Sequence, residues 1–445
     1  SGTISCAFYS NRTSKSDCGS YDERSERNFG KSANHWEIEG GKILMNFHSI
    51  TLADNIYSVG ATDWSQRDFH GYETPKGVTY NAYLIKDEKI AVLDTVKFTF
   101  AEEYIERLKS LVDLSKIDYV IINHVEPDHS SALPSLMRHA PQAKVVCTEQ
   151  GKSEIRKYYG EEYDFMVVKE GDSISLGKRT LKFIPLPMLH WPDSMATYLV
   201  EDEILFSNDA FGQHICTTGK FDDENNLYEL LEEAAGYYAN ILMPLSRIAK
   251  NVLPKIEGLT LKMIAPSHGV IWRSHIDQIL KKYEEWCILE SQNKVVIVYD
   301  TMWGATEKMA YKIMEGLMAG GVQAKMLRAN STPSSEIAKE ILEARGVIVG
   351  SPTQHNGVLV TIGGLLYYFR GLQPKGKFAA AFGAFGWAGG SNGMIEEALK
   401  AAGMNVQPGI TVKWAANEQE LGACFTFGKQ FAEMVLDPSP AVDAK

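Results

Sequence analysis

The sequence lacks several features that would assign it to a broad class at once. Its six cysteines are scattered over 445 residues without a C-x-x-C pair, which disfavours a disulfide scaffold, a zinc ribbon or an internal rubredoxin-like iron centre. No apolar run approaches the roughly 20 residues of a membrane-spanning helix. Basic residues are in deficit, 45 against 56 acidic ones for a net charge of −11, which disfavours nucleic-acid or anionic-membrane partners. We therefore expect a soluble, cytoplasmic protein.

What is present is an ordinary globular composition over a length that one hydrophobic core rarely fills. Hydrophobic residues make up 44% of the chain and charged residues 23%, and single cores seldom grow beyond about 250–300 residues. Residues 1–41 are rich in Ser, Asn, Arg and Gly, and we interpret them as a tail, a vector-derived segment or a leader. Two domains are predicted to follow, 42–291 and 292–445.

The boundary near residue 291 is placed where the rhythm of the sequence changes. Before it, short β-rich runs alternate with loops: Tyr80–Ile85, Lys89–Leu93, Tyr119–Ile122, Lys144–Cys147, Leu181–Pro185, Thr197–Val200, Ile204–Ser207 and Met263–Ala265. After it, predicted strands and helices alternate regularly: Lys294–Tyr299, Glu307–Ala319, Gln323–Leu327, Ser335–Ala344, Gly346–Val349, Lys377–Phe382 and Gly393–Ala402. The first pattern is typical of a mixed α/β fold and the second of a doubly wound parallel sheet.

A dense group of candidate metal ligands follows the predicted strand Ile117–Ile122. Four candidates occupy six positions: His124, Glu126, Asp128 and His129. Three more stand in loops after later strands: His190, Asp209 and His268. Imidazole and carboxylate together suit iron, manganese or zinc better than calcium. Seven ligands exceed what one ion takes, so the sequence predicts a two-metal centre in which Asp209 is available as a bridge.

Three loops of the second predicted domain are typical of a flavin site. The first, T-x-x-G-x-T, offers hydroxyl and backbone N–H groups to a phosphate at a strand-to-helix turn, and it resembles the phosphate loop of flavodoxins. No P-loop lysine and no G-x-G-x-x-G is present, so ATP and NAD fit less well than FMN. The candidate FMN-binding residues are Thr301, Met302, Trp303, Gly304, Ala305 and Thr306; Pro352, Thr353, Gln354, His355, Asn356 and Gly357; and Ala384, Phe385, Gly386, Trp387 and Gly389.

The order of the metal-ligand candidates resembles that of the metallo-β-lactamase superfamily, whose fold is an αββα sandwich. Hydrolases of that superfamily show H-x-H-x-D-H and usually hold zinc, whereas Glu126 replaces the second histidine here. An anionic oxygen ligand favours a harder ion such as Fe(III), which indicates redox chemistry. Two alternatives stay open: a zinc-dependent hydrolase with a regulatory flavodoxin domain, and an electron carrier or redox sensor that has lost its metal chemistry.

The two motif sets together resemble the flavodiiron proteins, or A-type flavoproteins, over about residues 46–440. The resemblance implies an oxidoreductase that reduces O2 to water, nitric oxide to nitrous oxide, or both, at a non-haem diiron centre supplied with electrons through FMN. One iron would bind His124, Glu126 and His190. The other would bind Asp128, His129 and His268, with His129 the least secure ligand, and Asp209 would bridge them.

Partners are also implied by the resemblance. It suggests a head-to-tail homodimer or a dimer of dimers, and an external electron donor that is rubredoxin-like or an NADH-linked reductase. Four further residues are candidates for shaping a substrate pocket or donating protons, although packing is the commoner role of such residues: His70, Tyr72, Trp191 and Tyr238. Nothing in the ligand or flavin motifs distinguishes a preference for O2 from one for nitric oxide.

Overall fold

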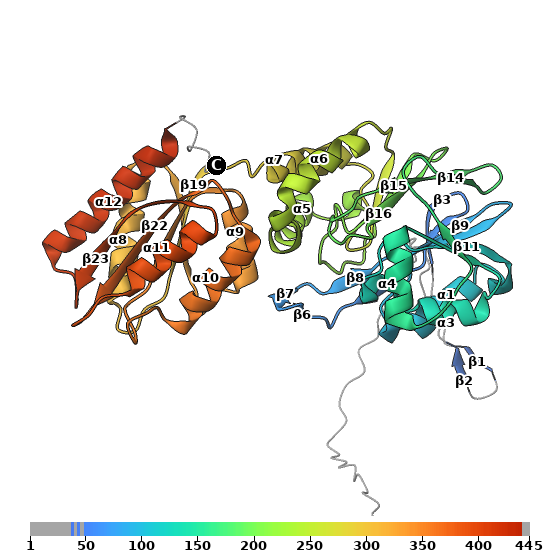
Figure 1. The fold of residues 1–445 in the computed structure, drawn as a ribbon, viewed down its shortest axis with the longest axis horizontal. Helices are drawn as coiled ribbons and strands as arrows, with labels where there is room; N and C mark the ends of the chain where they lie inside the picture. Colours follow the sequence, from blue (N-terminus) through green and yellow to red (C-terminus); the bar gives the residue numbers. More distant parts are fainter. Residues whose placement is uncertain (1–36, 40–41, 45–48, 438–445) are drawn as a thin grey trace, which may run out of the picture. The chain divides into compact units, whose positions relative to one another are not determined.

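The computed structural model describes residues 37–39, 42–44 and 49–437 (Figure 1). The predicted tail, 1–41, lies outside the described residues except for 37–39. Strand β1 (Glu37–Glu39) pairs antiparallel with β2 (Lys42–Leu44), and this small ladder belongs to a different unit from the described residues 49–437. None of the helices in the described ranges is both long and apolar enough to cross a membrane.

The first predicted domain contains two main sheets. The order in the larger sheet is β13-β12-β11-β10-β9-β4-β3, and in the smaller β14-β15-β16-β17-β18. The larger consists of β3 (Ile50–Ala53), β4 (Ile56–Ser58), β9 (Tyr83–Lys86), β10 (Ile90–Leu93), β11 (Ile117–Ile121), β12 (Lys144–Cys147) and β13 (Phe165–Val167). The smaller consists of β14 (Ser173–Ser175), β15 (Thr180–Pro185), β16 (Met195–Leu199), β17 (Ile204–Asn208) and β18 (Met263–Pro266). Two short ladders accompany them: β5 (Ala61–Asp63) with β8 (Val78–Tyr80), and β6 (Asp68–Phe69) with β7 (Tyr72–Glu73).

The two sheets pack against each other, and helices cover both outer faces. Side chains alternate along each strand: on β12, Val146 faces the other sheet, while Val145 and Cys147 pack with the helices. The larger sheet is covered by α1 (Ala101–Lys109), α3 (Leu133–His139) and α4 (Glu149–Tyr159), and the smaller by α5 (Leu227–Tyr237), α6 (Ser246–Glu257) and α7 (Ile276–Cys287). The predicted αββα sandwich is confirmed.

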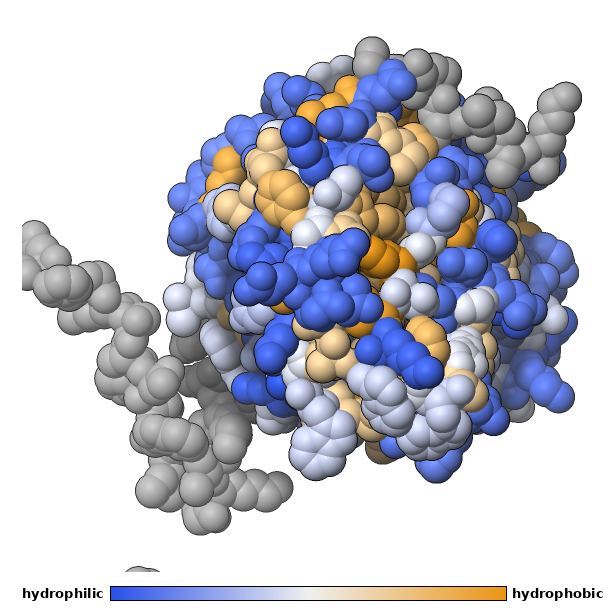
Figure 2. All heavy atoms as spheres, turned by 90° about the vertical axis from the view of Figure 1, so that its left-hand side faces the viewer, coloured by the Kyte–Doolittle hydropathy of each residue, from blue (hydrophilic) through white to orange (hydrophobic). Residues whose placement is uncertain are grey.

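The second predicted domain is built on one parallel sheet in the order β20-β19-β21-β22-β23. Its strands are β19 (Gln292–Tyr299), β20 (Gln323–Arg328), β21 (Ala344–Gly350), β22 (Phe378–Phe385) and β23 (Asn405–Lys413). Helices α8 (Ala305–Ala319) and α12 (Glu418–Leu436) cover one face, and α9 (Ser334–Leu342), α10 (Val360–Leu372) and α11 (Ser391–Ala401) the other. This doubly wound order is that of flavodoxins, as predicted. Figure 2 shows one face of this part, where apolar patches interrupt a largely hydrophilic surface.

Two details of the predicted elements are wrong. The predicted strand Tyr80–Ile85 is divided, because Asn81 donates its backbone N–H to the Ser267 carbonyl (2.8 Å) and so leaves the ladder. Strand β22 continues to Phe385, which places Ala384 inside the sheet and not in a loop. The predicted boundary at 291/292 falls between α7 and β19 and stays a prediction.

Candidate functional site

The predicted metal ligands stand directly beyond the carboxyl ends of four strands. The run from His124 to His129 follows β11, and its second half forms the short helix α2 (Pro127–Ser130). His190, Asp209 and His268 follow β15, β17 and β18. Because β11 belongs to one sheet and the other three strands to its partner, the packing of the sandwich brings all seven side chains together in two adjoining clusters.

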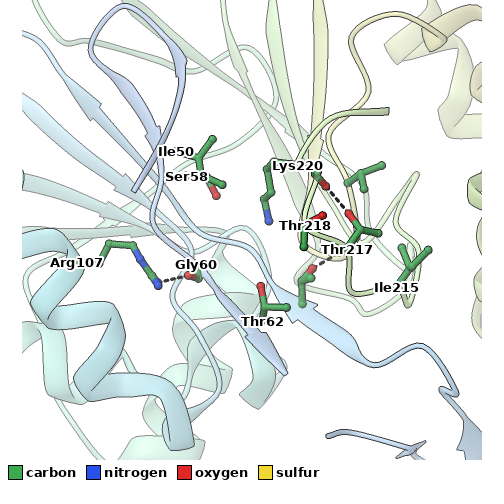
Figure 3. A pocket seen from close by; sticks show the side chains of 13 residues that line it. Ile50, Ser58, Gly60, Thr62, Arg107, Ile215, Thr217, Thr218 and Lys220 are labelled. Carbon is green, nitrogen blue, oxygen red and sulfur yellow. Dashed lines mark hydrogen bonds between the residues drawn. The ribbon is translucent and has the colours of Figure 1, made fainter. Parts of the chain in front are cut away.

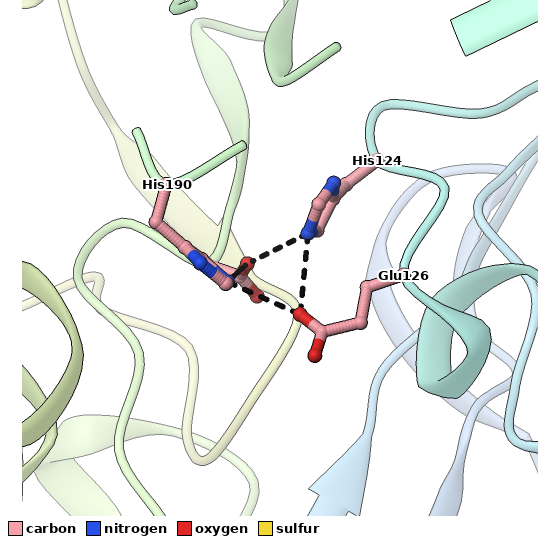
Figure 4. Close-up of side chains that lie close together, drawn as sticks. His124, Glu126 and His190 are labelled. Carbon is pink, nitrogen blue, oxygen red and sulfur yellow. Dashed lines mark hydrogen bonds and ion pairs between the residues drawn. The ribbon is translucent and has the colours of Figure 1, made fainter. Parts of the chain in front are cut away.

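The first cluster consists of His124, Glu126, His190 and Asp209, and Figure 4 shows the two labelled histidines converging on the glutamate. Glu126 Oε2 lies 3.3 Å from Nε2 of His124 and 3.1 Å from Nε2 of His190. Asp209 Oδ2 lies 3.6 and 3.1 Å from the same two nitrogens. These four ligand atoms therefore surround one point.

The second cluster is formed by Asp128, His129 and His268. Nε2 of His129 lies 3.3 Å from Asp128 Oδ1, and Nε2 of His268 lies 3.2 Å from Asp128 Oδ2. The other oxygen of Asp209, Oδ1, approaches these nitrogens at 3.0 Å for His129 and 3.7 Å for His268. Asp209 thus turns one carboxylate oxygen toward each cluster.

The residues of the two clusters fit metal ions. Within the described part of the chain, no hydrogen bond reaches the carboxylate oxygens of Asp128 and Asp209 or the ring nitrogens of His129, although all are buried. Burial raises the pKa of Asp209, but the histidines around it, led by His129, hold that pKa well below its usual range. Buried carboxylate oxygens and ring nitrogens that point toward one another with no hydrogen-bond donor between them need a cation there.

Residues outside the predicted set hold the histidine rings. Asp193 accepts a hydrogen bond from Nδ1 of His124 (3.1 Å) and another from the Val125 backbone N–H (2.6 Å). The Thr79 carbonyl accepts from Nδ1 of His268 (2.6 Å). Such contacts orient the ring and direct Nε2 to the metal. The sequence analysis missed both; the only signal for Asp193 is its position in the loop of His190.

An adjoining cavity of about 230 Å³ is lined mainly by aromatic and imidazole side chains. Two of the candidate pocket residues, His70 and Tyr72, line it, and Nε2 of His70 lies 2.9 Å from Glu126 Oε1. The hydrogen bond to Glu126 raises the pKa of His70. The other two candidates have packing roles. Trp191 packs edge-on against His124 and does not line the cavity. The cavity is lined by Tyr237 and not by Tyr238, which points into the core at the start of a π-helical turn.

The first predicted flavin loop lies between β19 and α8. Gly304 adopts φ +81° immediately before the helix and donates its N–H to Thr301 Oγ1 (3.0 Å). In the first turn of α8, the buried Oγ1 of Thr306 has no hydrogen-bond partner among the described residues. An unpartnered hydroxyl beside the free N–H groups of a helix start is suited to a phosphate, so this loop fits FMN.

The other two predicted flavin loops follow β21 and β22, at the same edge of the sheet. Gln354 and Gly357 bond to each other's backbone, so that His355 and Asn356 form a tight turn with positive φ. After β22, Trp387 is 88% exposed, and its ring centroid lies 6.0 Å from that of Trp414. The three loops thus meet at the point where the strand order reverses, which is where doubly wound sheets bind ligands.

Comparison with known proteins gives the same two-part picture. Residues 78–269 match the family described as ODP family beta lactamase, and residues 297–428 match the flavodoxin family. A nitric oxide reductase from Moorella thermoacetica is 46% identical over 395 residues, which cover 87% of this chain and 99% of that protein.

Two solved structures are also similar over nearly their whole length. The flavodiiron protein from Giardia intestinalis superposes with a TM-score of 0.85 at 36% identity, covering 87% of this chain and 97% of that one. The rubredoxin:oxygen oxidoreductase from Desulfovibrio gigas has the same TM-score at 37% identity, with 87% and 98% covered. The similarity therefore extends over both predicted domains, which carry the predicted metal and flavin sites.

Proposed function

The chain belongs to the flavodiiron protein family, and we propose that its two buried clusters hold two iron ions at which O2 is reduced to water, nitric oxide to nitrous oxide, or both. The observation that carries the proposal is the position of Asp209. One of its oxygens faces His124 and His190, and the other faces His129 and His268. A carboxylate shared in this way is suited to bridging two ions.

The proposed residue roles follow from these distances. One iron is held by His124, Glu126 and His190, the other by Asp128, His129 and His268, with Asp209 between them. With two irons and a two-electron flavin, the loaded protein supplies the four electrons that O2 needs to form two waters, and also the two electrons that two NO molecules need to form N2O and water. The chain itself positions these groups, and Asp193 and Thr79 fix the orientation of two ligand rings.

The cavity beside the clusters is the proposed substrate pocket. Its mixed lining of Phe69, Tyr72 and Tyr237 beside the ligands His190 and His268 suits a small, weakly polar gas molecule. The Tyr72 hydroxyl is buried without a hydrogen-bond partner in the part of the chain that is described. We assign to His70 and Tyr72 the delivery of protons and the restriction of water at this pocket.

FMN is proposed to bind at the three loops, with its phosphate at Thr301–Thr306. Large side chains are exposed in and beside these loops: Met302 46%, Trp303 94%, Val360 86%, Tyr367 82%, Trp387 88% and Trp414 60%. A cluster of exposed apolar and aromatic residues is typical of an interaction surface. It supports the proposed head-to-tail homodimer, or dimer of dimers, in which this surface meets a second subunit.

An external protein is proposed to supply the electrons, either a rubredoxin-like carrier or an NADH-linked reductase. The name of the relative from Desulfovibrio gigas, a rubredoxin:oxygen oxidoreductase, supports the first class of donor. The proposed location is the cytoplasm, which the four described cysteines support because all are buried and unpaired. The zinc-hydrolase alternative is not favoured, since the relatives are named as oxidoreductases.

The decisive experiment measures gas consumption by the iron- and FMN-loaded protein. The protein is reduced without oxygen, and O2 and nitric oxide are then added separately while an electrode records their uptake. We expect rapid uptake of at least one gas, with water as the product from O2 and N2O as the product from nitric oxide. Protein that carries FMN but no iron should take up O2 much more slowly, with hydrogen peroxide as the product of flavin reoxidation. Equal uptake with and without iron would refute the proposal.

A further inference from the structure

A second cavity, of about 100 Å³, lies in the first domain, and its lining contains none of the proposed iron ligands or FMN-binding residues (Figure 3). It does contain Thr79, whose carbonyl accepts the hydrogen bond from His268. We call this cavity the Lys220 pocket. Its polar lining includes Ser58, Thr62, Arg107, Thr217, Thr218 and Lys220. These residues come from β4, β5, α1 and the loop before Phe221, so the pocket is assembled by the fold and not by one local motif.

The ammonium group of Lys220 has no acidic partner in the described ranges. Its Nζ donates to Asn81 Oδ1 at 2.6 Å, which accounts for one of three donors. Glu224, an acidic residue four positions further along the chain, is engaged elsewhere, because its Oε2 accepts from the backbone N–H groups of Lys220 (2.7 Å) and Phe221 (3.1 Å). The remaining N–H donors of Lys220 are therefore available to a ligand.

A second cation lines the same cavity. The Arg107 guanidinium is held by Glu103 (2.5 Å) and by the carbonyls of Val59 (3.2 Å) and Gly60. Burial, and to a smaller extent the charge of Arg107, lowers the pKa of Lys220 to about 8. Arg107 is thus already paired with Glu103, whereas no acidic side chain of the described residues pairs with Lys220, so an anion in the cavity would offset the charge of that ammonium group.

The other side chains that line the Lys220 pocket indicate which class of anion fits it. Hydroxyl groups of Ser58, Thr62 and Thr218 can turn to donate hydrogen bonds, and together with an ammonium group they form the donor set that recognises oxyanions. No aromatic side chain lines the pocket among the described residues, so a nucleobase would have no stacking partner. The volume accommodates an ion of a few heavy atoms.

We propose that the Lys220 pocket binds a small oxyanion of the phosphate or carboxylate class. The bound anion would also act on the second metal cluster through Asn81. The amide of Asn81 that accepts from Lys220 donates its Nδ2 to the carbonyls of Pro266 (2.9 Å) and Gly269 (3.0 Å), on either side of His268. Occupation of the pocket would therefore stabilise the loop that carries this ligand.

The test is calorimetric titration of the full-length, iron- and FMN-loaded protein with inorganic phosphate and, separately, with acetate. We expect saturable binding of at least one of them, weakened at least about tenfold in Lys220→Met because a charge-assisted hydrogen bond is lost. Lys220→Arg, which keeps the charge, should bind within a few-fold of the wild type. Lys262→Met is the matched control, because Lys262 pairs with Glu203 at the surface and lies outside the pocket.

Hydrogen exchange then locates the site. The bound anion should slow exchange of backbone amides in 217–220 and 266–270, and this protection should disappear in Lys220→Met. Binding that is unchanged in Lys220→Met, or the absence of any saturable binding of either anion to the wild type, would overturn the proposal. Circular dichroism of Lys220→Met and Lys220→Arg should match that of the wild type, so a loss of binding would not reflect unfolding.

Discussion

Asp209 is the only described residue whose two side-chain oxygens approach ligands of both clusters, at 3.0–3.7 Å. We predict that Asp209→Ala lowers iron content and reduces gas turnover by at least about 100-fold, since losing a residue that merely orients a ligand already costs 10–100-fold. FMN content should stay at the wild-type level. Iron analysis, flavin absorbance and electrode assays check this, with Asp202→Ala, which removes a partly buried partner of Arg179 outside both clusters, as the control. Full turnover by Asp209→Ala would exclude the bridging role.

Lys377 offers a second prediction for a single residue, this time about stability. Its buried ammonium donates to the carbonyls of Leu342 (2.9 Å) and Ala344 (2.7 Å), and burial lowers its pKa to about 7. Between about pH 7 and 10 the unfolded chain therefore binds the proton more tightly than the folded one, so this group makes folding more favourable as pH rises.

The corresponding experiment compares the wild type with Lys377→Met, which removes the titrating group. The free energy of unfolding of Lys377→Met, taken relative to that of the wild type, should be highest near pH 7 and should be lower at pH 9.5, because only the wild type gains stability from Lys377 as pH rises. Urea unfolding at both pH values measures the difference. If the free energy of unfolding changes by the same amount between pH 7 and pH 9.5 in both proteins, the pKa of Lys377 is not lowered in the folded state.

The loop between β19 and α8 carries the prediction at the scale of an element. A Cβ added at Gly304 meets nothing within 4 Å, so only its φ of +81° opposes a side chain. A β-branched residue in this conformation costs roughly 1–2 kcal/mol or more, and Gly304→Val should therefore distort the phosphate loop and weaken FMN binding about tenfold or more. Titration of the FMN-free protein with FMN, followed by flavin fluorescence, measures the loss.

The matched control for this loop is Gly364→Ala in helix α10. Gly364 also has open space around it, but its backbone does not have positive φ. Alanine should therefore be tolerated there, with FMN binding unchanged and stability slightly raised. Iron content should be normal in both variants. Unchanged FMN affinity in Gly304→Val would indicate that the flavin phosphate does not depend on this turn.

At the scale of the whole molecule, the proposed homodimer would pass electrons from the FMN of one subunit to the iron of the other. Co-expression of Asp209→Ala, which should keep FMN, with Gly304→Val, which should keep iron, should then restore activity that neither variant has alone. We expect about a quarter of the wild-type activity, because half of randomly assorted dimers are hybrids with one complete pair each. Activity no higher than the sum of the separate variants would contradict transfer between subunits.

The predictable part of the fold followed from local patterns. Regular alternation after residue 291 indicated the parallel sheet, and the dense group of ligand candidates after the predicted strand Ile117–Ile122 indicated where a metal centre would form. The prediction failed where long-range contacts override local preference. Asn81 interrupts an apparently continuous strand because its polar groups bond the loop of His268, and a π-helical turn turns Tyr238 into the core while Tyr237 lines the cavity.

The sequence by itself determined the chemistry of this protein: which residue types are available as ligands, their order along the chain, and the loops suited to a flavin phosphate, because residue identity and spacing are local properties. Only the tertiary structure decided how these groups meet. Three features depend on how the two sheets of the first domain pack: the directions of the two oxygens of Asp209, the hydrogen bonds of Asp193 and Thr79 to the ligand rings, and the presence of Lys220 and Arg107 in one pocket. Contacts between such distant segments cannot be read from spacing along the chain.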